Sequence, residues 1–309
     1  MDQSFVFDNC ENSLRRYGGS DRKASIRIGN SFFMIKYNDR ISTSDRNDLN
    51  SSYRNSAYSE YIACHILNSI GIKAQETFLG KKDGKIVVAC KDFRTNGFQL
   101  NEFEKYATAN NIELERYPDI NKVMSIFSND GTIPFEKARE QFWDIFVGDA
   151  ILGNFDRHSG NWGYLYNDEQ RIIELAPVYD CGACLYPMMS DEGMPSVLSS
   201  QEKINERIFH YPKSAFSLEG KKIDYYNFLN STEDTACLKS IIKVSSNVDK
   251  EKIFEIIDNT PFISDVRKSF YKTMLKERIE KIIEPARERA ERKIKEKEKE
   301  REIFPGKEW

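Results

Sequence analysis

Alternating apolar and polar residues in the first third of the chain predict β-strands. The segments KASIRIG (residues 23–29) and SFFMIKYN (31–38) both show the two-residue period of a strand, and Gly29-Asn30 between them is typical of a hairpin turn. The segment GKIVVACKDF (84–93), which begins just after another turn signal, predicts a further strand. We therefore expect a β-rich N-terminal part built around a hairpin.

Helical spacing of apolar residues replaces the strand pattern in two longer segments. Residues 57–70 (AYSEYIACHILNSI) predict a helix that Gly71 terminates. Residues 135–153 predict a second helix, in which Phe142, Phe146 and Ala150 share one face and further apolar residues flank it. Because apolar side chains cover so much of its surface, we expect this second helix to be well buried.

The C-terminal half is predicted to be mainly helical. Residues 181–225 contain Gly, Pro, Ser and Met without clear periodicity and indicate a long functional loop, while helical patterns return at about 249–284. The segment EPARERAERKIKEKEKERE (284–302) alternates in charge and has almost no apolar stripe, so we interpret it as a solvated helix or a frayed tail. These patterns predict an α+β protein in three parts: a β-rich lobe over 1–95, a mainly helical lobe over 96–285 and a charged helix or tail over 286–309.

Composition narrows the classes of protein that this chain can belong to. Its net charge of −3 and pI near 5.9 argue against a general nucleic-acid binder, which would present a basic surface. No apolar run approaches the ~20 residues of a membrane helix, and the N-terminus lacks the basic and apolar regions of a Sec signal peptide. Six cysteines are too few for a disulfide scaffold in a chain of this length. We expect a reduced, cytoplasmic protein with no membrane partner and no direct nucleic-acid partner.

A polar cluster at residues 152–166 (LGNFDRHSGNWGYLY) contains the first candidate chemistry. It holds Asp156 and Asn161 in a D-x4-N arrangement, and Asp180 follows later in the chain. Phosphoryl transfer uses this set of groups, with one carboxylate near the acceptor hydroxyl and an Asn and an Asp that hold Mg²⁺ between the phosphates. Asn154, Asp156 and Asn161 are also good turn formers, so the segment by itself fits a polar turn at least as well.

Two other motifs suggest metal or redox chemistry but lack the partners that it needs. His158 is one of three histidines, and none of them lies at ligand spacing from another, so we interpret it as a structural residue that braces its loop. The segment CGAC (181–184) imitates a C-x-x-C motif, but no thioredoxin-type pattern surrounds it and no second cysteine pair is present. We assign neither zinc nor redox chemistry to these motifs.

A glycine-rich turn and a strand lysine form a second group of candidates. Gly18-Gly19-Ser20 precede the first predicted strand, where backbone amides could bind phosphate oxygens, although plain hairpin geometry also explains them. Lys36 is an isolated charge in an apolar strand, and if it is buried it must find an anion, for which Glu60 in the next helix is the candidate. The alternative is a solvated lysine at a strand edge. The turn is not a Walker A motif.

The order of these separate signals points to phosphoryl transfer. A glycine-rich turn, a strand lysine, a helix glutamate, a hinge-like strand, a D-x4-N loop and a later aspartate follow one another as in protein kinases. Two segments are more specific. Asn154-Asp156-His158-Asn161 and Ala176-Pro177-Tyr179-Asp180 resemble the catalytic loop (N-x-D-x-H-x-x-N) and the metal-binding segment (A-P-x-Y-D) of the HipA-like serine/threonine kinases. The resemblance runs from about residue 15 to 190 and fades through the C-terminal third.

The resemblance implies a two-lobed, protein-kinase-like fold of the HipA-like type, with a β-rich N-lobe and a mainly helical C-lobe. It implies a reaction with ATP and Mg²⁺, serine or threonine phosphorylation of a protein substrate, and autophosphorylation. Carried over residue by residue, the resemblance assigns Asp156 as the catalytic aspartate and Asn161 and Asp180 as metal ligands. It assigns Lys36 as a contact of the ATP phosphates and Glu60 as the residue that positions Lys36. The phosphate loop is then formed by Gly18, Gly19, Ser20 and Lys23, and the hinge that binds adenine by Ala89, Lys91 and Phe93.

Two departures from the family pattern limit what carries over. The chain begins almost directly at the phosphate loop, so we expect the extra N-terminal subdomain of full-length HipA toxins to be missing, which weakens the case for a HipB-like DNA-binding antitoxin partner. HipA kinases also carry an autophosphorylated serine in the phosphate-loop segment. Ser20 and Ser13 are both candidates for that position here.

Two other functions compete with a protein kinase. The D-R-H-x-x-N segment also resembles the catalytic loop of phosphatidylinositol kinases, which makes a lipid or small-molecule kinase the alternative enzyme, although residues 181–200 contain no Lys or Arg to face a membrane. A pseudokinase scaffold that uses the charged tail is the non-enzyme alternative, and the complete set of catalytic residues argues against it. We expect a cytoplasmic location, and the lack of a Sec signal leaves open export by another route as an effector that acts in a host cell.

Overall fold

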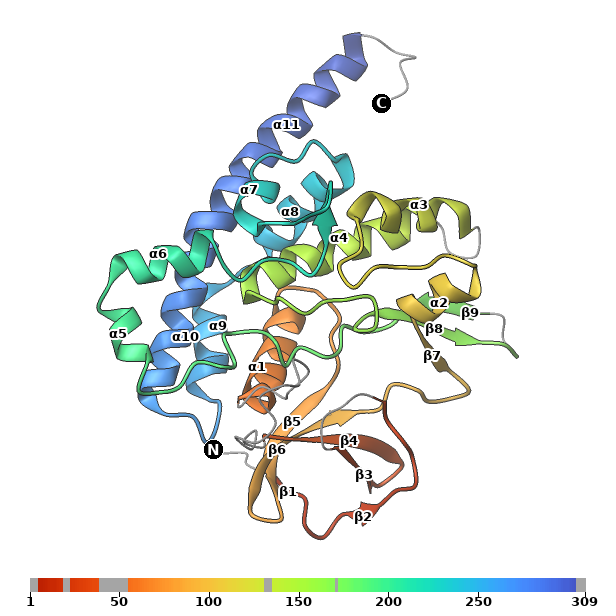
Figure 1. Cartoon of the computed structure of the whole chain (residues 1–309), viewed down its shortest axis with the longest axis vertical. Coiled ribbons are helices and arrows are strands. Elements are labelled where there is room, and N and C mark those ends of the chain that lie inside the picture. Colours follow the sequence, from red (N-terminus) through yellow and green to blue (C-terminus); the bar gives the residue numbers. More distant parts are fainter. Residues whose placement is uncertain (1–4, 19–22, 39–54, 131–134, 170–171, 304–309) are drawn as a thin grey trace.

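The predicted hairpin and helix of the N-terminal lobe are both present in the computed structural model of the chain (Figure 1). The structure describes residues 5–18, 23–38, 55–130, 135–169 and 172–303. Strands β3 (Lys23–Ile28) and β4 (Ser31–Tyr37) pair in antiparallel register, and Gly29 starts their two-residue turn with a φ of +59°, which glycine adopts without steric cost. The predicted helix follows as α1 (Ser56–Ser69).

Side chains of the N-terminal sheet alternate between its two faces, as the two-residue period predicts. Among the described residues the sheet has six strands in the order β1-β5-β6-β4-β3-β2. The strands not yet introduced are β1 (Phe5–Val6), β2 (Glu11–Asn12), β5 (Thr77–Lys82) and β6 (Lys85–Lys91). Phe33 and Ile35 of β4 join a buried cluster on the outer face, whereas Met34 and Lys36 lie on the face that α1 covers.

Helix α1 packs against both lobes. Its first turns place Ala57 and Tyr58 against Leu79 and Val88 of the sheet. Its later turns, including Ile66, belong to the main core of the helical lobe. In Figure 1 this helix lies between the sheet and the remaining helices. A side chain on α1 is therefore fixed in position relative to both lobes.

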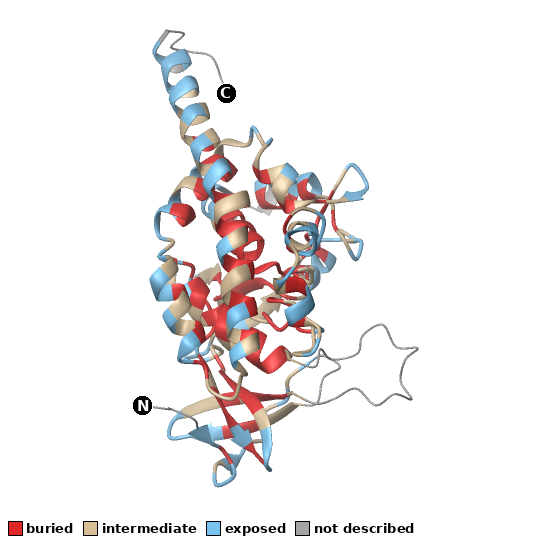
Figure 2. Cartoon of the chain, turned by 90° about the vertical axis from the view of Figure 1, so that its left-hand side faces the viewer, coloured by how far each residue is buried: buried red, intermediate tan, exposed pale blue. Residues whose placement is uncertain are grey.

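The helical lobe is organised around α4 (Phe135–Leu152), the second predicted helix. Phe142, Phe146 and Ala150 are all buried, as predicted, and Figure 2 shows the buried residues concentrated in the interior of this lobe. The other helices are α2 (Phe103–Ala109), α3 (Ile120–Asp130), α5 (Met194–Leu198), α6 (Gln201–Phe209), α7 (Tyr225–Leu229), α8 (Thr235–Ser246), α9 (Lys250–Asp258), α10 (Asp265–Arg278), a π-helical turn (Ile279–Ile283) and α11 (Glu284–Ile303). Its strands are β7 (Gln99–Glu102), β8 (Gly163–Asn167) and β9 (Ile172–Leu175), which form one sheet, and the hairpin β10 (Ser217–Leu218) and β11 (Lys221–Lys222).

Residues 181–225 are not the long irregular loop that the sequence predicts. They contain α5, α6, the β10–β11 hairpin and the start of α7. The sequence pattern also does not predict the later helix α8. The elements of this region are too short for a helical period to stand out, since α5 and α7 have five residues each. Local signals do mark α6, because the Ser200 side chain accepts the backbone N–H of Lys203 and caps the helix.

The charged segment 284–302 is helical, but its first half is not solvated on every side. Ala286, Ala290 and Ile294 of α11 lie at successive i, i+4 positions and pack on the core of the helical lobe. This stripe corrects the prediction of a helix with almost no apolar face, and it is hard to recognise because alanine is only weakly apolar. The rest of α11 extends beyond the lobe (Figure 1).

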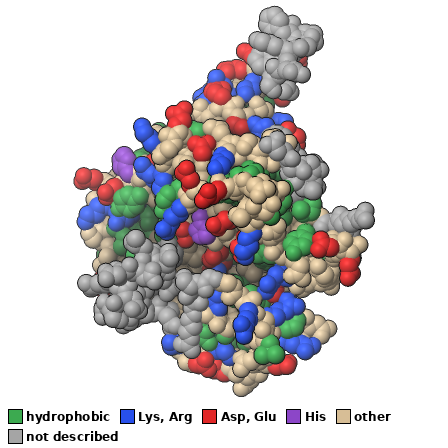
Figure 3. All heavy atoms as spheres, turned by 45° about the vertical axis from the view of Figure 1, so that its right-hand side comes forward, with side chains coloured by type: hydrophobic (Ala, Val, Ile, Leu, Met, Phe, Trp, Pro, Cys, Tyr) green, Lys and Arg blue, Asp and Glu red, His purple; other side chains and the backbone are tan. Residues whose placement is uncertain are grey.

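One surface feature agrees with the composition. The face drawn in Figure 3 mixes acidic and basic side chains, in line with a net charge of only −3. None of the described helices combines the length and the apolar character that a bilayer span requires.

Candidate active site

A cleft of about 180 Å³ brings together many of the predicted nucleotide-binding and metal-binding residues. The predicted residues that line it are Gly18, Lys23, Lys36, Phe93, Asn161 and Asp180. Asp92 of the predicted hinge segment and Tyr179 of the A-P-x-Y-D motif also line it. The residues in its walls that sequence reasoning missed are Tyr17, Met34, Gln75, Arg94, Leu100, Glu102 and Gly160. Gly19 and Ser20 of the predicted phosphate loop lie outside the described residues, while Lys23 donates to the backbone O of Gly18.

A buried lysine connects three elements at this cleft. Lys36 Nζ on β4 donates to Glu60 Oε2 on α1 at 2.8 Å and to Asp180 Oδ1 after β9 at 2.9 Å. Burial by itself lowers the pKa of Lys36, but the carboxylates of Asp180 and Glu60 outweigh it and raise the pKa well above its ordinary value. The ammonium therefore stays charged although Lys36 is only 7% exposed. The sequence prediction that Glu60 neutralises a buried Lys36 is confirmed.

Asp180 presents an ionised carboxylate to the cleft. Its backbone has a φ of +55°, in the left-handed region that aspartate tolerates better than most residues. Burial acts to raise the pKa of Asp180, but the adjacent Lys36 ammonium outweighs it and lowers the pKa to about 2. The side chain is 44% exposed, so one of its oxygens can bind Lys36 while the carboxylate still faces the cleft.

The predicted catalytic loop is held in shape by its own side chains. Asn154 Oδ1 accepts the backbone N–H of Asp156 at 3.0 Å, and Asn161 Nδ2 donates to the backbone O of Asp156 at 2.8 Å. His158 Nδ1 accepts the backbone N–H of Gly160 at 3.1 Å, so the histidine braces the loop as predicted. The turn interpretation and the site interpretation of this segment are thus compatible, because the turn hydrogen bonds are what fix Asp156.

Asp156 and Asn161 face two different hollows. Asn161 lines the cleft together with Asp180, whereas Asp156 lines a neighbouring hollow with Glu104 and Arg116. Burial raises the pKa of Asp156, and nearby cationic groups oppose that rise. The amide oxygen of Asn161 and the carboxylate of Asp180 are hard oxygen donors in one cleft, a donor set that suits Mg²⁺.

Two of the three predicted hinge residues do not reach the cleft. Ala89 belongs to the apolar cluster on the outer face of the sheet, and Lys91 forms an ion pair with Glu76 at 2.6 Å. Both positions are still within strand β6, where every second side chain points to the outer face. Phe93, just beyond the strand, does line the cleft. The hinge wall therefore begins at Asp92.

Asp92 fastens the segment before the phosphate loop to this hinge. Its Oδ2 accepts from Arg15 Nη1 at 2.8 Å, from Arg94 Nη2 at 2.8 Å and from the Tyr17 hydroxyl at 3.1 Å. No sequence signal connects Arg15 with Asp92, which are 77 positions apart. The place of Met34 in the cleft, in contrast, could have been predicted. Met34 is two positions before Lys36 on the same strand, so the two side chains lie on the same face of the sheet.

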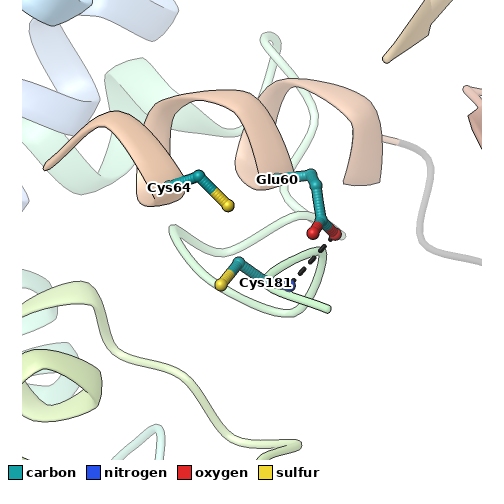
Figure 4. A group of neighbouring side chains, drawn as sticks. All are labelled: Glu60, Cys64 and Cys181. Atoms are coloured by element: carbon teal, nitrogen blue, oxygen red, sulfur yellow. Dashed lines mark hydrogen bonds between the residues drawn. The ribbon is translucent and has the colours of Figure 1, made fainter. Parts of the chain in front are cut away.

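The CGAC segment lies directly behind the cleft. Figure 4 shows Glu60 and Cys64 reaching from α1 toward the loop of Cys181, and the possible ligand atoms of these three residues lie within 4.8 Å of one another. Glu60 Oε2 already accepts from Lys36 and from the backbone N–H of Cys181, and Arg157 Nη2 lies 3.4 Å from Cys181 Sγ. These two positive side chains disfavour a further cation. All six cysteines, each within the described residues, are free thiols.

Lys36 and Glu60 offer a test of the buried ion pair. We expect Lys36→Met to lower the free energy of unfolding by about 3–5 kcal/mol, because it leaves Glu60 buried without a counter-charge. Lys36→Met combined with Glu60→Gln removes both charges and should recover most of that loss. Urea denaturation of the three proteins measures the difference. The control is Lys91→Met, which breaks an exposed pair and should cost less than about 1 kcal/mol. A double variant as unstable as Lys36→Met would contradict the pairing.

Asp92 predicts a pH dependence of stability. Burial acts to raise the pKa of Asp92, but hydrogen bonds from Arg94 and Arg15 outweigh it and hold the pKa below its ordinary 3.8. A carboxyl with a depressed folded-state pKa contributes stability above its ordinary pKa and loses it as the pH falls below that value. We expect Asp92→Asn to flatten the acid limb of the free energy of unfolding, measured between about pH 5 and pH 2. Asp168→Asn, at an exposed position, should leave the limb unchanged, and equal slopes for wild type and Asp92→Asn would refute the assignment.

Three comparisons relate this chain to known proteins. The family described as HipA-like C-terminal domain matches residues 16–260. The serine/threonine-protein kinase CtkA of Helicobacter pylori is 42% identical over 290 residues, which cover 92% of this chain and 88% of that protein. The crystal structure of the H. pylori proinflammatory kinase CtkA superposes with a TM-score of 0.86 at 39% identity, over 94% of this chain and 98% of that chain.

A more distant structure shares the fold. HipA of Shewanella oneidensis, solved with HipB and its operator DNA, matches 90% of this chain and 68% of its own with a TM-score of 0.57 at 13% identity, which is a likeness of fold alone. The expected α+β, two-lobed kinase-like fold is confirmed by these superpositions. On the strength of the family match and the extensive identity to CtkA, the chain belongs to the HipA-like family.

Proposed function

We propose that this chain is a serine/threonine protein kinase that transfers the γ-phosphoryl group of ATP to a hydroxyl group of a protein. The observation that carries the proposal is the contact of Lys36 with both Glu60 and Asp180, next to a loop that points Asn161 into the cleft and Asp156 into the adjoining hollow. Protein kinases use these groups in these relative places. The relative that is 42% identical is named a serine/threonine-protein kinase.

The cleft has the mixed chemistry that a nucleotide requires. Met34, Phe93 and Leu100 supply apolar surface that suits a flat base, and Lys23 and Lys36 supply positive charge that suits phosphate oxygens. Asp92, held by Arg15 and Arg94, fixes the chain beside Phe93. These features support ATP as the phosphoryl donor.

Asn161 and Asp180 are the residues that would hold Mg²⁺. The positive charge that a bound magnesium ion would supply there would neutralise the phosphate oxygens during transfer. Lys36 adds its ammonium to the same end of the cleft, and Glu60 would keep that ammonium oriented if Asp180 also held a metal ion. The buried pair therefore acts as a fixed electrostatic frame for the phosphates.

Asp156 would act on the acceptor hydroxyl. In the transfer, the hydroxyl oxygen forms a bond to the γ-phosphorus, the bond from that phosphorus to the ADP oxygen breaks, and the hydroxyl proton passes to the Asp156 carboxylate. Asp156 lines a hollow next to the nucleotide cleft, and an acceptor that lies there would extend its hydroxyl to the γ-phosphoryl group. Burial, which raises the pKa of Asp156, makes it a better proton acceptor than an exposed carboxylate.

The partners proposed here are a protein substrate and the chain itself by autophosphorylation. HipB and operator DNA accompany HipA in the distant structural match, but that match supports the fold alone, so we propose no antitoxin partner. The predicted location stays the cytoplasm or, after export by a route other than Sec, a host cell.

Asp156→Asn tests the proposed mechanism. We expect it to reduce phosphate transfer by a factor of about 10²–10⁴, because the neutral amide cannot accept the hydroxyl proton. Transfer of radiolabel from ATP to the chain and to a generic protein substrate measures the loss, while circular dichroism and calorimetric ATP binding should be unchanged. Asp168→Asn, an exposed substitution of the same kind, should transfer phosphate normally.

Three results would overturn the proposal. Full activity in a clean Asp156→Asn preparation would remove Asp156 from the mechanism. Label that enters lipid vesicles and no protein would favour a lipid kinase. Absence of any label with wild-type protein, ATP and Mg²⁺, together with unchanged partner binding by Asp156→Asn, would favour a scaffold.

Mass spectrometry after incubation with ATP tests autophosphorylation. We expect phosphate in the segment between Ser13 and Lys23, on Ser13 or Ser20, since the HipA-like pattern places it there. Ser13 is a described residue whose Oγ accepts the backbone N–H of Arg15 at 3.2 Å, whereas Ser20 lies outside the described residues. Single Ser13→Ala and Ser20→Ala variants identify the site. Phosphate found only within residues 181–225 would contradict the prediction.

A further inference from the structure

Arg157 is a charged side chain that the catalytic loop turns into the protein. It is 1% exposed and is among the largest fully buried side chains of the described residues. Its guanidinium meets the carboxylate of Asp149, near the end of α4, with Nε at 3.0 Å from Oδ2 and Nη2 at 3.1 Å from Oδ1. Two parallel contacts of this kind fix both the position and the plane of the guanidinium.

The remaining donors of this guanidinium reach the two segments that carry the proposed metal ligands. Nη1 donates to the backbone O of Asn161 at 2.9 Å and also to the backbone O of Tyr179, the residue before Asp180. Nη2 lies 3.4 Å from the Sγ of Cys181, the residue after Asp180. One rigid planar group therefore contacts the chain at Asn161 and on both sides of Asp180.

We propose that Arg157 is a positioning residue that sets the distance between Asn161 and Asp180 and thereby the affinity of the site for a divalent cation. The proposal rests on the proposed function, because it takes these two residues as metal ligands. Asp149 supports this role, because it holds the guanidinium in the orientation that reaches both Asn161 and the residues on either side of Asp180.

Stability alone gives a poor account of the Arg157–Asp149 pair. Burying two charges has a desolvation cost that their attraction often fails to offset, and apolar side chains of similar volume are frequently as stabilising. The geometric role is better supported, because the Asp149 carboxylate also accepts Asn154 Nδ2 at 2.9 Å, and Asn154 in turn accepts the backbone N–H of Asp156. Asp149 thus anchors Asp156 on one side and, through Arg157, both metal ligands on the other.

Arg157→Lys is the first test of this role. Lysine keeps the positive charge opposite Asp149, but its ammonium is a compact donor without the planar fork that bonds Asp149, Asn161 and Tyr179 together. We expect the affinity for Mn²⁺, used as a spectroscopic probe in the presence of a non-hydrolysable ATP analogue, to fall about 10–100-fold. Electron paramagnetic resonance measures it without any phosphate transfer. Affinity for the analogue without metal should stay within about twofold of wild type, which separates positioning from general damage.

A second variant covers the case in which Arg157→Lys does not fold. Asp149→Asn combined with Arg157→Met leaves no unpaired buried charge, and the asparagine oxygen can still accept from Asn154. We expect this double variant to fold and to show the same loss of Mn²⁺ affinity. Arg278→Lys is the matched control, since Arg278 is equally buried and also donates to backbone oxygens, those of Ala150 and Arg207, away from the metal ligands. It should bind Mn²⁺ as wild type does.

The outcomes separate this proposal from the proposed function. A folded Arg157→Lys or double variant that binds Mn²⁺ as tightly as wild type overturns the positioning role. A loss equal to that of Arg278→Lys overturns it as well, because any buried arginine would then have the same effect. A wild-type protein that binds Mn²⁺ and nucleotide, loses Mn²⁺ affinity in the Arg157 variants and phosphorylates no protein would support the positioning role and contradict the proposed function.

Discussion

The burial of the Lys36 ammonium is the constraint on which the rest of the site depends. A lysine on an apolar sheet face keeps its charge only if carboxylates are brought to it, and one carboxylate alone would leave some of its donors unpaired. Glu60 comes from α1 and Asp180 from the loop after β9, so three elements must meet at one atom. Because α1 packs on both lobes, this meeting point also fixes how the cleft is assembled.

The chain between α1 and β5 connects the loop that carries Asp180 to the same part of the structure. Ala74 forms a parallel bridge with Val178, in which the backbone N–H of Gln75 donates to Val178 O at 2.8 Å and that of Val178 donates to Lys73 O at 2.9 Å. The side chain of Asn68, on α1, accepts from the backbone N–H of Ala74 at 2.9 Å. Asp180 is only two residues beyond this bridge. Glu60 and Asp180 are therefore held to one another through the backbone as well as through Lys36.

The sequence predicts the parts of this site that follow from local rules. An isolated lysine in an apolar strand, if it is buried, requires an anionic partner, and Glu60 in the next helix is the candidate that the sequence offers. The turn chemistry and the family motif indicate the loop from Asn154 to Asn161. The sequence does not indicate at which residue a strand stops pairing with its neighbours. Strand β6 continues to Lys91 because both β4 and β5 pair with it. As a result, the side chains of Ala89 and Lys91 point away from the cleft.

Contacts between distant segments are the other part that sequence patterns do not reveal. Arg15 and Asp92 meet only after the sheet has formed, and nothing in either local sequence indicates the other. Arg157 looks like a solvated member of a polar turn until α4 supplies Asp149 beneath it. Ala290 of α11 is similar, because a small residue in a charged segment becomes part of the core only through the surface that it packs on.

Asp180 lies between two buried ion pairs, Lys36–Glu60 and Arg157–Asp149. These two pairs explain how Asp180 keeps an unfavourable backbone conformation. On one side, the N–H of Cys181 donates to Glu60 Oε2 at 3.0 Å, and Glu60 is paired with Lys36. On the other side, the carbonyl of Tyr179 accepts from Arg157, and Arg157 is paired with Asp149. A left-handed φ in a residue other than glycine persists only when its surroundings determine it, and here both flanking peptide groups are held. The carboxylate is thus fixed in position, which would reduce the ordering required for a metal ion to bind there, as proposed.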